Sequence, residues 1–239
     1  RDFCLSRGLG DVYKRQVKFD EHQKMPTTRI EYSYYLIAVD AELQMMPSRL
    51  LEGEQTAHFL TERFDRQNGK KVHIQTLAAM NPSADSYEAL FEAACRIGVP
   101  PGELRQLFRS MVLNVLGGNV DDHNKNFSFL MDDDGHWHVA PAYDYTFSVD
   151  PDAPYYVNRH SMTVNNKTEG ITAEDLLEVA RRYGIKAAEP FIEKAIGIVS
   201  HYPEYGREAG VGEEWIGTIE KEIAARIECV SDNRADRLK

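Results

Sequence analysis

The order of apolar and polar residues predicts a β-rich first part of the chain and a mainly helical second part. In the first part, three short apolar runs bounded by turn residues have the pattern of β-strands: residues 16–19, 48–51 and 58–64. A helix is predicted to begin at Pro26, and Thr28 and Glu31 have the spacing of a capping box in its first turn. The polar stretch 67–71 contains a glycine and is expected to be a loop.

The second part of the chain has apolar residues at helical spacing. In residues 103–116 these side chains fall at i, i+3 and i+4 positions, which predicts a helix with a wide buried face that ends at Gly117 and Gly118. Further helices are predicted at residues 87–97, 172–183, 186–201 and 213–230, the second of these four capped by Thr172. Residues 127–140 have the pattern of a β-hairpin with its turn at Asp132–Gly135. Together these elements predict an α+β fold with a small mixed β/α lobe and a mainly α-helical C-terminal lobe.

Composition excludes several classes of protein. The chain of 239 residues has a formal net charge of −10, whereas a protein that binds DNA or RNA directly usually presents a basic surface, so direct nucleic-acid binding is disfavoured. No run approaches the ~20 apolar residues that a membrane-spanning helix needs. Cys4, Cys95 and Cys229 are odd in number and widely spaced, which favours a reducing cytoplasm over a disulfide framework.

The first residues have no pattern of their own. Residues 1–16 begin without a methionine and show neither helical nor strand periodicity, and no apolar segment follows their basic residues as in a signal peptide. We interpret residues 1–16 as a remnant of expression or sequence assembly and exclude them from the predicted fold. The chain is therefore expected to be truncated at its N-terminus.

Candidate chemistry is concentrated between Gly117 and Thr146. Phosphoryl transfer in kinases needs a carboxylate that orients the attacking hydroxyl, a side-chain amide that holds a metal ion, and a second carboxylate that joins the metal to the phosphates. Asp121 and Asn126 have the five-residue separation of the Asp and Asn in a protein-kinase catalytic loop. Asp144 follows the predicted hairpin, where kinases place the metal-binding Asp. The sequence therefore predicts a phosphoryl-transfer site.

The stretch G-N-V-D-D-H-N-K-N-F-S, with A-P-A-Y-D after the hairpin, closely resembles the HipA family of bacterial serine/threonine kinases. The family pattern is close to G-N-x-D-x-H-x-K-N-F-S, a hairpin, and L-x-P-x-Y-D. This chain departs from it in having a second Asp at position 122 and Val139-Ala140-Pro141-Ala142 in place of the commoner L-x-P. Neither departure removes a functional group.

The resemblance implies roles for the loop residues. Asp121 would be the catalytic base, and Asn126 and Asp144 would bind Mg²⁺. Two further side chains, His123 and Lys125, would lie against the phosphates of ATP. Tyr143 would line the same pocket.

Upstream motifs agree with the same family. Val17-Lys18-Phe19 resembles the strand whose lysine pairs with ATP phosphates, and Glu31 resembles the glutamate that pairs with that lysine. Thr61–Arg66 resembles the hinge, where the backbone of Glu62 and Phe64 would meet adenine and Asp65 would reach the ribose. Phosphates must bridge Lys18 and Asp144, so these two residues are expected within ~10 Å of each other.

Downstream, residues 171–176 resemble a helix start of the family, so the resemblance covers residues 17–239. It implies a protein-kinase-like fold, with an incomplete N-lobe and hinge at residues 17–70 and a helical C-lobe at residues 71–239. It also implies ATP and Mg²⁺ as cofactors, a protein substrate, and a HipB-like DNA-binding antitoxin as partner. The family's phosphate-binding loop should precede Lys18, and Gly8-Leu9-Gly10 is too close to Lys18 to be that loop.

Other functions fit parts of the pattern. A truncated chain is compatible with a catalytically silent fragment that binds a nucleotide or an antitoxin. A small-molecule kinase of the aminoglycoside type shares a D-x-H-x-x-N loop, although the E-R-F-D-R hinge and the Y-D motif favour HipA. A metal-dependent nuclease built on Asp121, His123 and His138 would need a basic surface. Asp132–Asp134 form an acidic turn before Gly135, and His136 with His138 lacks a third ligand nearby, so turn and strand roles are expected there rather than metal binding.

Overall fold

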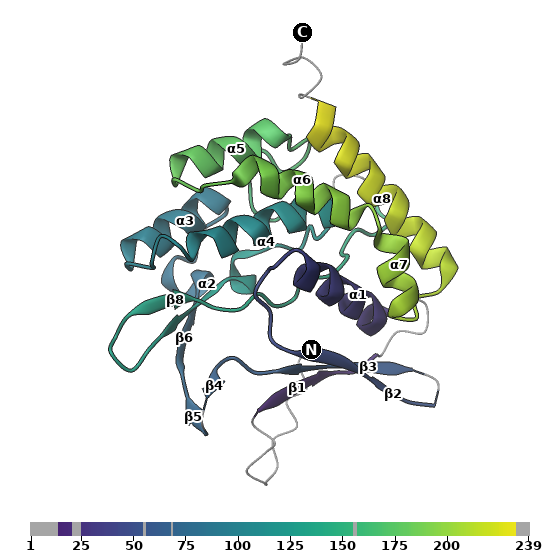
Figure 1. Ribbon diagram of the computed structural model, residues 1–239, viewed down its shortest axis with the longest axis horizontal. Helices are drawn as coiled ribbons and strands as arrows, with labels where there is room; N and C mark the ends of the chain where they lie inside the picture. Colours follow the sequence, from purple (N-terminus) through teal and green to yellow (C-terminus); the bar gives the residue numbers. More distant parts are fainter. Residues whose placement is uncertain (1–13, 21–24, 55, 68, 155–156, 233–239) are drawn as a thin grey trace.

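The computed structural model describes residues 14–20, 25–54, 56–67, 69–154 and 157–232. A small antiparallel sheet lies on one side of the molecule and a group of helices on the other, with a second sheet at the edge (Figure 1). The predicted α+β class is therefore confirmed. Most of the segment interpreted as a remnant, including Gly8-Leu9-Gly10, lies outside the described residues.

The first sheet has the strand order β1-β3-β2 and is antiparallel throughout. Its strands are β1 (Arg15–Lys18), β2 (Ser48–Glu52) and β3 (Ala57–Glu62). Arg15, expected to lie outside the fold, pairs with Glu62, so the first strand begins one residue before its predicted start at Gln16. Strand β3 ends at Glu62, which leaves Phe64 beyond the ladder rather than inside it.

Helix α1 (Thr27–Asp40) lies between this sheet and the helical part of the molecule (Figure 1). The predicted capping box is wrong, because neither partner caps the helix: the Thr28 hydroxyl donates to the carbonyl oxygen of Ala57 (2.6 Å) and Glu31 binds Lys18. Both side chains are buried against the sheet, where tertiary partners replace local ones. On the opposite face, the buried Tyr34 hydroxyl donates to the carbonyl oxygen of Gly117.

Residues 67–71, predicted to be a loop, belong instead to a short hairpin of β4 (Arg66–Gln67) and β5 (Lys70–Lys71). Strand β6 (His73–Thr76) and helix α2 (Leu77–Met80), which were not predicted, follow it. Strand β6 pairs with β7 (Ser128–Met131), which in turn pairs with β8 (Trp137–Val139). The predicted hairpin at residues 127–140 is therefore confirmed, and the strand that extends it was concealed by its polar sequence H-I-Q-T.

The helices of the second part agree closely with the prediction. They are α3 (Tyr87–Arg96), α4 (Leu104–Gly117), α5 (Ala173–Arg182), α6 (Ala188–Val199), α7 (Tyr202–Glu208) and α8 (Glu213–Ser231). Helix α4 is central: Met111–Gly117 are all buried, and Gly118 ends the helix at a φ of 69°, which favours glycine. Helix α7 was not expected. In the described part of the chain, no helix is both long and apolar enough to cross a membrane.

The β7–β8 hairpin is attached to the start of α4 by the Glu103 carboxylate. One Glu103 oxygen lies 2.8 Å from the Nδ1 atom of His138, and the other accepts a hydrogen bond from the backbone of Val139 (2.8 Å). The opposite ring nitrogen of His138 is 3.2 Å from the Asp132 carboxylate. The hairpin is therefore held by charged groups at both its base and its turn.

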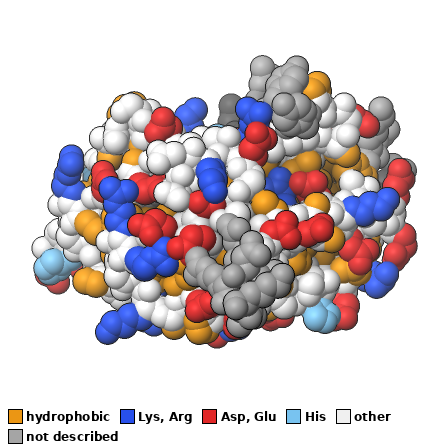
Figure 2. All heavy atoms as spheres, turned by 90° about the horizontal axis from the view of Figure 1, so that it is seen from above, with side chains coloured by type: hydrophobic (Ala, Val, Ile, Leu, Met, Phe, Trp, Pro, Cys, Tyr) orange, Lys and Arg blue, Asp and Glu red, His pale blue; other side chains and the backbone are white. Residues whose placement is uncertain are grey.

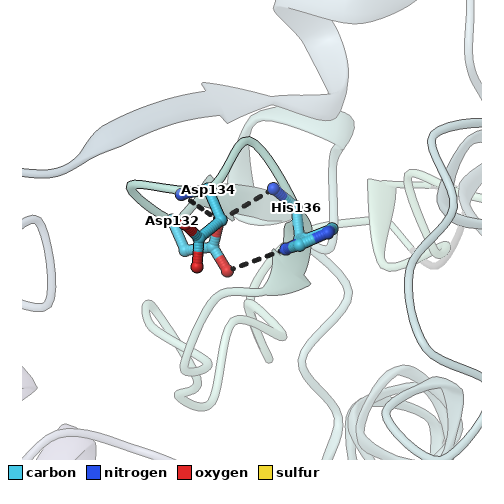
Figure 3. Close-up of side chains that lie close together, drawn as sticks. All are labelled: Asp132, Asp134 and His136. Atoms are coloured by element: carbon cyan, nitrogen blue, oxygen red, sulfur yellow. Dashed lines mark hydrogen bonds and ion pairs between the residues drawn. The ribbon is translucent and has the colours of Figure 1, made fainter.

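Asp132, Asp134 and His136 place ligand atoms within 4.8 Å of one another in that turn (Figure 3). One Asp132 oxygen accepts hydrogen bonds from the backbone N–H groups of Asp134 (3.0 Å) and His136 (2.8 Å). The bond from His136 is the main reason that the pKa of Asp132 falls to about 2. These hydrogen bonds form the turn itself, so the three side chains are explained by its structure.

His138 should titrate with a pKa above the ordinary value of about 6.5, because its hydrogen bonds to Glu103 and then to Asp132 favour the protonated ring. A raised folded-state pKa stabilises the fold fully below about pH 6.5, and this stabilisation is lost as pH rises through the folded value. We expect Glu103→Gln to lower the His138 pKa, as followed by NMR of the ring protons. A distant change on α6, Glu189→Gln, is the control. An unchanged His138 pKa in Glu103→Gln would contradict this assignment.

Candidate active site

A cleft of about 950 Å³ lies between the first sheet and the segments on either side of the β7–β8 hairpin. Every site residue singled out from the sequence lines it: Lys18, Glu62, Phe64, Asp65, Asp121, His123, Lys125, Asn126, Tyr143 and Asp144. These residues come from distant parts of the chain, so their convergence is a property of the fold and not of local sequence.

Lys18 joins the two sides of the cleft. Its ammonium group lies 2.7 Å from a Glu31 carboxylate oxygen and is also hydrogen-bonded to the Asp144 carboxylate. The expected proximity of Lys18 and Asp144 is thereby confirmed. Burial by itself lowers the pKa of Lys18, but the charges of Glu31 and Asp144 and their hydrogen bonds outweigh burial and hold the pKa well above its usual range. Lys18 is therefore a permanent cation.

Asp144 has a backbone φ of 53°, in the left-handed region that most L-residues avoid. Short polar residues such as Asp tolerate this conformation best. The carbonyl oxygen of Asp144 accepts a hydrogen bond from the Asn119 side chain (3.3 Å), which helps to hold the backbone there. The unusual conformation directs the Asp144 carboxylate toward Lys18. The Asp144 side chain is nevertheless 43% exposed.

The loop after α4 presents Asp121 to solvent on a fixed backbone. The Asp121 side chain is 68% exposed, whereas its backbone N–H donates to the Ser148 hydroxyl (3.0 Å). A 3₁₀ turn, η1 (Asn124–Asn126), follows, and the Asn126 side-chain nitrogen donates to the carbonyl oxygen of Asp121 (2.9 Å). This bond closes the loop. It also occupies the amide nitrogen of Asn126 and orients the amide oxygen away from that bond. The amide oxygen of Asn126 and the carboxylate of Asp144 are the hard oxygen donors that suit Mg²⁺.

His123 lies beside Asp121, with its Nε2 atom 3.8 Å from an Asp121 oxygen. Its Nδ1 atom is buried and has no hydrogen-bond partner among the described residues, although it belongs to a side chain that lines the cleft.

Tyr143 supports the loop from the other side. Its hydroxyl donates to the carbonyl oxygen of Lys125 (2.8 Å) and lies 2.5 Å from the Ser128 hydroxyl. Burial raises the pKa of Tyr143 to about 12, and the charge of Asp144 acts in the same direction despite the opposing bond to Ser128. The phenol therefore stays protonated and able to donate. It holds the backbone of Lys125 in place, while the Lys125 side chain lines the cleft.

The hinge segment refines the expectation for nucleotide contacts. The backbone N–H of Glu62 already donates to the carbonyl oxygen of Pro47 (3.1 Å). The Phe64 ring packs against the Tyr143 ring, with centroids 5.6 Å apart.

The Asp65 carboxylate, expected near the ribose, is held by two arginines. Arg63 binds it with two nitrogens, at 2.8 and 2.7 Å, and Arg66 binds it at 2.6 Å. Burial raises the pKa of Asp65, but the bonds and charge of Arg63 and the charge of Arg66 outweigh burial and lower it. A ribose hydroxyl at this position would have to share Asp65 with these arginines.

Two residues of the site were not singled out from the sequence. Asn119 and Ser148 both line the cleft and connect the backbones of Asp121 and Asp144. The Ser148 hydroxyl donates to the side-chain oxygen of Asn119 (3.2 Å). Asn119 occupies the Asn position of the G-N-x-D pattern, so the sequence did contain a signal for it. The sequence contained no signal for Ser148, because a serine after an irregular segment is ordinary in a loop.

Comparison with known proteins identifies the architecture. The model of the HipA-like C-terminal domain family matches residues 13–204. No curated protein matches the chain. A structure of the Shewanella oneidensis MR-1 toxin–antitoxin system HipA, HipB and its operator DNA is similar, with a TM-score of 0.68 and 19% identity over 91% of this chain and 58% of that chain. This chain therefore spans less than two thirds of the Shewanella protein.

The Helicobacter pylori proinflammatory kinase CtkA is also similar, with a TM-score of 0.61 and 17% identity over 94% of this chain and 91% of that chain. Likeness at these identities shows the fold, which is protein-kinase-like, as predicted.

The Lys18–Glu31 pair should make a measurable contribution to stability. Lys18→Met removes the Lys18 ammonium group from the Glu31 carboxylate, whose side chain is only 10% exposed. We expect a loss of about 2 kcal/mol in the free energy of unfolding, below the ~3–5 kcal/mol of a fully buried pair because Lys18 is itself 27% exposed. Adding Glu31→Gln should recover at least half of that loss in urea unfolding. The exposed pair of Lys194 and Glu42 provides the control, and Lys194→Met should cost less than about 1 kcal/mol. Equal losses in Lys18→Met and Lys194→Met would refute the expectation.

Proposed function

The chain belongs to the family of HipA-like C-terminal domains, and on this premise we propose that it is an ATP-dependent serine/threonine protein kinase. One observation carries the proposal: Lys18 binds both Glu31 and Asp144, the latter 126 positions away, in a cleft that Asp121 and Asn126 also line. Phosphoryl transfer in kinases requires a lysine paired with a glutamate and an aspartate that can bind the metal ion, all at one cleft.

Asn126 and Asp144 would hold Mg²⁺ through side-chain oxygens. When bound, the metal would neutralise charge on the phosphate oxygens. Lys18, kept in position by Glu31, would supply a second positive charge to the same phosphates. Asp121 would accept the proton of the attacking hydroxyl, and its exposure on a hydrogen-bonded loop suits a base that must reach an incoming protein side chain.

The nucleotide would lie between the hinge and the Tyr143 side of the cleft. Since the N–H of Glu62 is engaged by Pro47, we propose that Glu62 contributes its carbonyl oxygen and Phe64 its backbone N–H to adenine. Asp65 would accept a ribose hydroxyl while it remains bound to Arg63. His123 and Lys125 would lie against the phosphates.

Partners are proposed from the same likeness. The Shewanella structure contains HipA with HipB and operator DNA, and we propose a HipB-like antitoxin for this protein as well. DNA contact would then belong to the antitoxin, which the net charge of −10 on this chain supports. On the helical face opposite the first sheet, acidic side chains lie interspersed among the Lys and Arg side chains (Figure 2).

Two substitutions separate the roles of the carboxylates. Asp121→Asn removes the base, so phosphate transfer should fall by ~10²–10⁴-fold while Mg²⁺-ATP affinity stays within a few-fold. Asp144→Ala removes a metal ligand, so transfer and the Mg²⁺-dependent part of the affinity should both fall. Labelled γ-phosphate incorporation into the protein itself and into casein measures transfer, and calorimetry with and without Mg²⁺ measures binding. Asp133→Asn, exposed in the hairpin turn, is the control.

The role assignment fails if Asp121→Asn transfers phosphate at nearly the wild-type rate. It also fails if Asp121→Asn loses Mg²⁺-dependent affinity to the same extent as Asp144→Ala. If wild-type protein binds no ATP at millimolar Mg²⁺, the kinase proposal itself is wrong.

A further inference from the structure

Asp122, next to the proposed base, is fully buried and does not line the cleft. Its carboxylate accepts hydrogen bonds from the Tyr87 hydroxyl (2.8 Å), the His160 Nδ1–H (2.9 Å) and the backbone N–H groups of Ser161 (2.8 Å) and Met162 (3.4 Å). Removing a carboxylate from water is costly unless it is bonded in this way. Asp121 and Asp122 are thus adjacent carboxylates in opposite environments.

One branch of this network leads from Asp122 to helix α8. His160 is 4% exposed, and its Nε2 atom lies 3.2 Å from an Arg226 nitrogen. Because a guanidinium has only donors, Nε2 accepts, and the ring proton is on Nδ1, directed at Asp122. Arg226 also donates to Glu222 (2.8 Å). The loop is therefore tied to helix α8 through Arg226.

A second branch leads from Asp122 to the backbones of Asp121 and Asp144. The Tyr87 hydroxyl accepts from the Asn114 side chain (2.9 Å), whose oxygen accepts from Asn119 (3.0 Å). Asn119 donates in addition to the carbonyl oxygen of Asp144 (3.3 Å). Through Ser148, Asn119 is also linked to the backbone N–H of Asp121, as described above. One buried polar network thus ends on the backbones of Asp121 and Asp144.

We propose that Asp122 is a positioning residue that fixes the Asp121 loop and, through Tyr87, Asn114 and Asn119, the backbone of Asp144. The role deepens the proposed kinase function and rests on it. Asp122 touches neither nucleotide nor acceptor. It sets the relative position of the two groups that do, and small displacements of such groups lower rates strongly.

Asp122→Asn keeps the size of the side chain but places an amide N–H₂ group opposite the hydrogen-bond donors of Tyr87 and His160. The Asn oxygen can still accept from Ser161, whereas the Tyr87 hydroxyl and the His160 Nδ1–H lose their acceptor. We expect kcat to fall at least tenfold, with the KM for Mg²⁺-ATP within threefold of wild type, because Asp122 does not line the cleft. Tyr87→Phe, a milder change, breaks the second branch alone and should lower kcat at least threefold.

Asp175 provides a matched control. It is 3% exposed and accepts hydrogen bonds from Lys167 (2.8 Å), Asn165 (2.9 Å) and both the N–H (2.8 Å) and the hydroxyl (2.7 Å) of Thr172. It caps α5 and does not line the cleft. Asp175→Asn makes the same chemical change at an equally bonded site, so it reports the effect of lost stability alone.

The experiment measures phosphate transfer per folded molecule and hydrogen–deuterium exchange for wild type, Asp122→Asn, Tyr87→Phe and Asp175→Asn. We expect Asp122→Asn and Tyr87→Phe to lower kcat and to increase the rate of exchange at residues 118–126 and 143–148. Asp175→Asn should keep the wild-type kcat and exchange faster only near α5. A kcat for Asp122→Asn and Tyr87→Phe equal to that of Asp175→Asn overturns the proposal.

Exchange distinguishes this proposal from the proposed function. If wild-type protein transfers no phosphate, the kinase proposal fails, and exchange alone decides whether Asp122 anchors both segments. Unchanged exchange at residues 118–126 and 143–148 then refutes the anchor. If Asp122→Asn does not fold, Tyr87→Phe provides the same comparison.

Discussion

The whole arrangement depends on one ammonium group shared by two carboxylates. Lys18 is on the first strand, Glu31 on the helix that covers the sheet, and Asp144 beyond the hairpin of the second sheet. A half-buried cation is stable only if its partners are held in place. Helix α1 must therefore pack on both sides at once, and it does so through Thr28 toward the sheet and Tyr34 toward α4. The cleft exists because these contacts keep sheet and helices at a fixed distance.

The same need for fixed geometry explains the buried polar residues behind the cleft. Asp122 and Asn114 would be poor choices for a core that only had to be stable, because apolar residues of similar size avoid their desolvation. Fully bonded, they make the loop after α4 rigid, and the left-handed backbone of Asp144 is held by the same network. Rigidity behind an exposed Asp121 is what a preorganised site requires.

Much of the fold was predictable from local sequence patterns. The hairpin and helix α4 follow rules that act over a few residues, and both were confirmed. The spacing of Asp121 and Asn126 is equally local, but the roles that it suggests stay a prediction. The errors came where distant residues decide. Thr28 and Glu31 have capping-box spacing, but the sheet and Lys18 offered better partners. Strand β6 is specified by its pairing with β7 rather than by its own composition. Asp122 could be noticed in the sequence, yet its burial depends on Tyr87 and His160, which no spacing connects.

The most direct test of the account is a crystal structure with Mn²⁺ and a non-hydrolysable ATP analogue. We expect the anomalous signal of manganese at the side-chain oxygens of Asn126 and Asp144. Lys18 should leave Asp144 for the phosphates while it keeps its bond to Glu31, because the metal replaces it as the cation beside Asp144. Manganese bound elsewhere, or a nucleotide outside the cleft with the Lys18–Asp144 pair intact, would contradict the account.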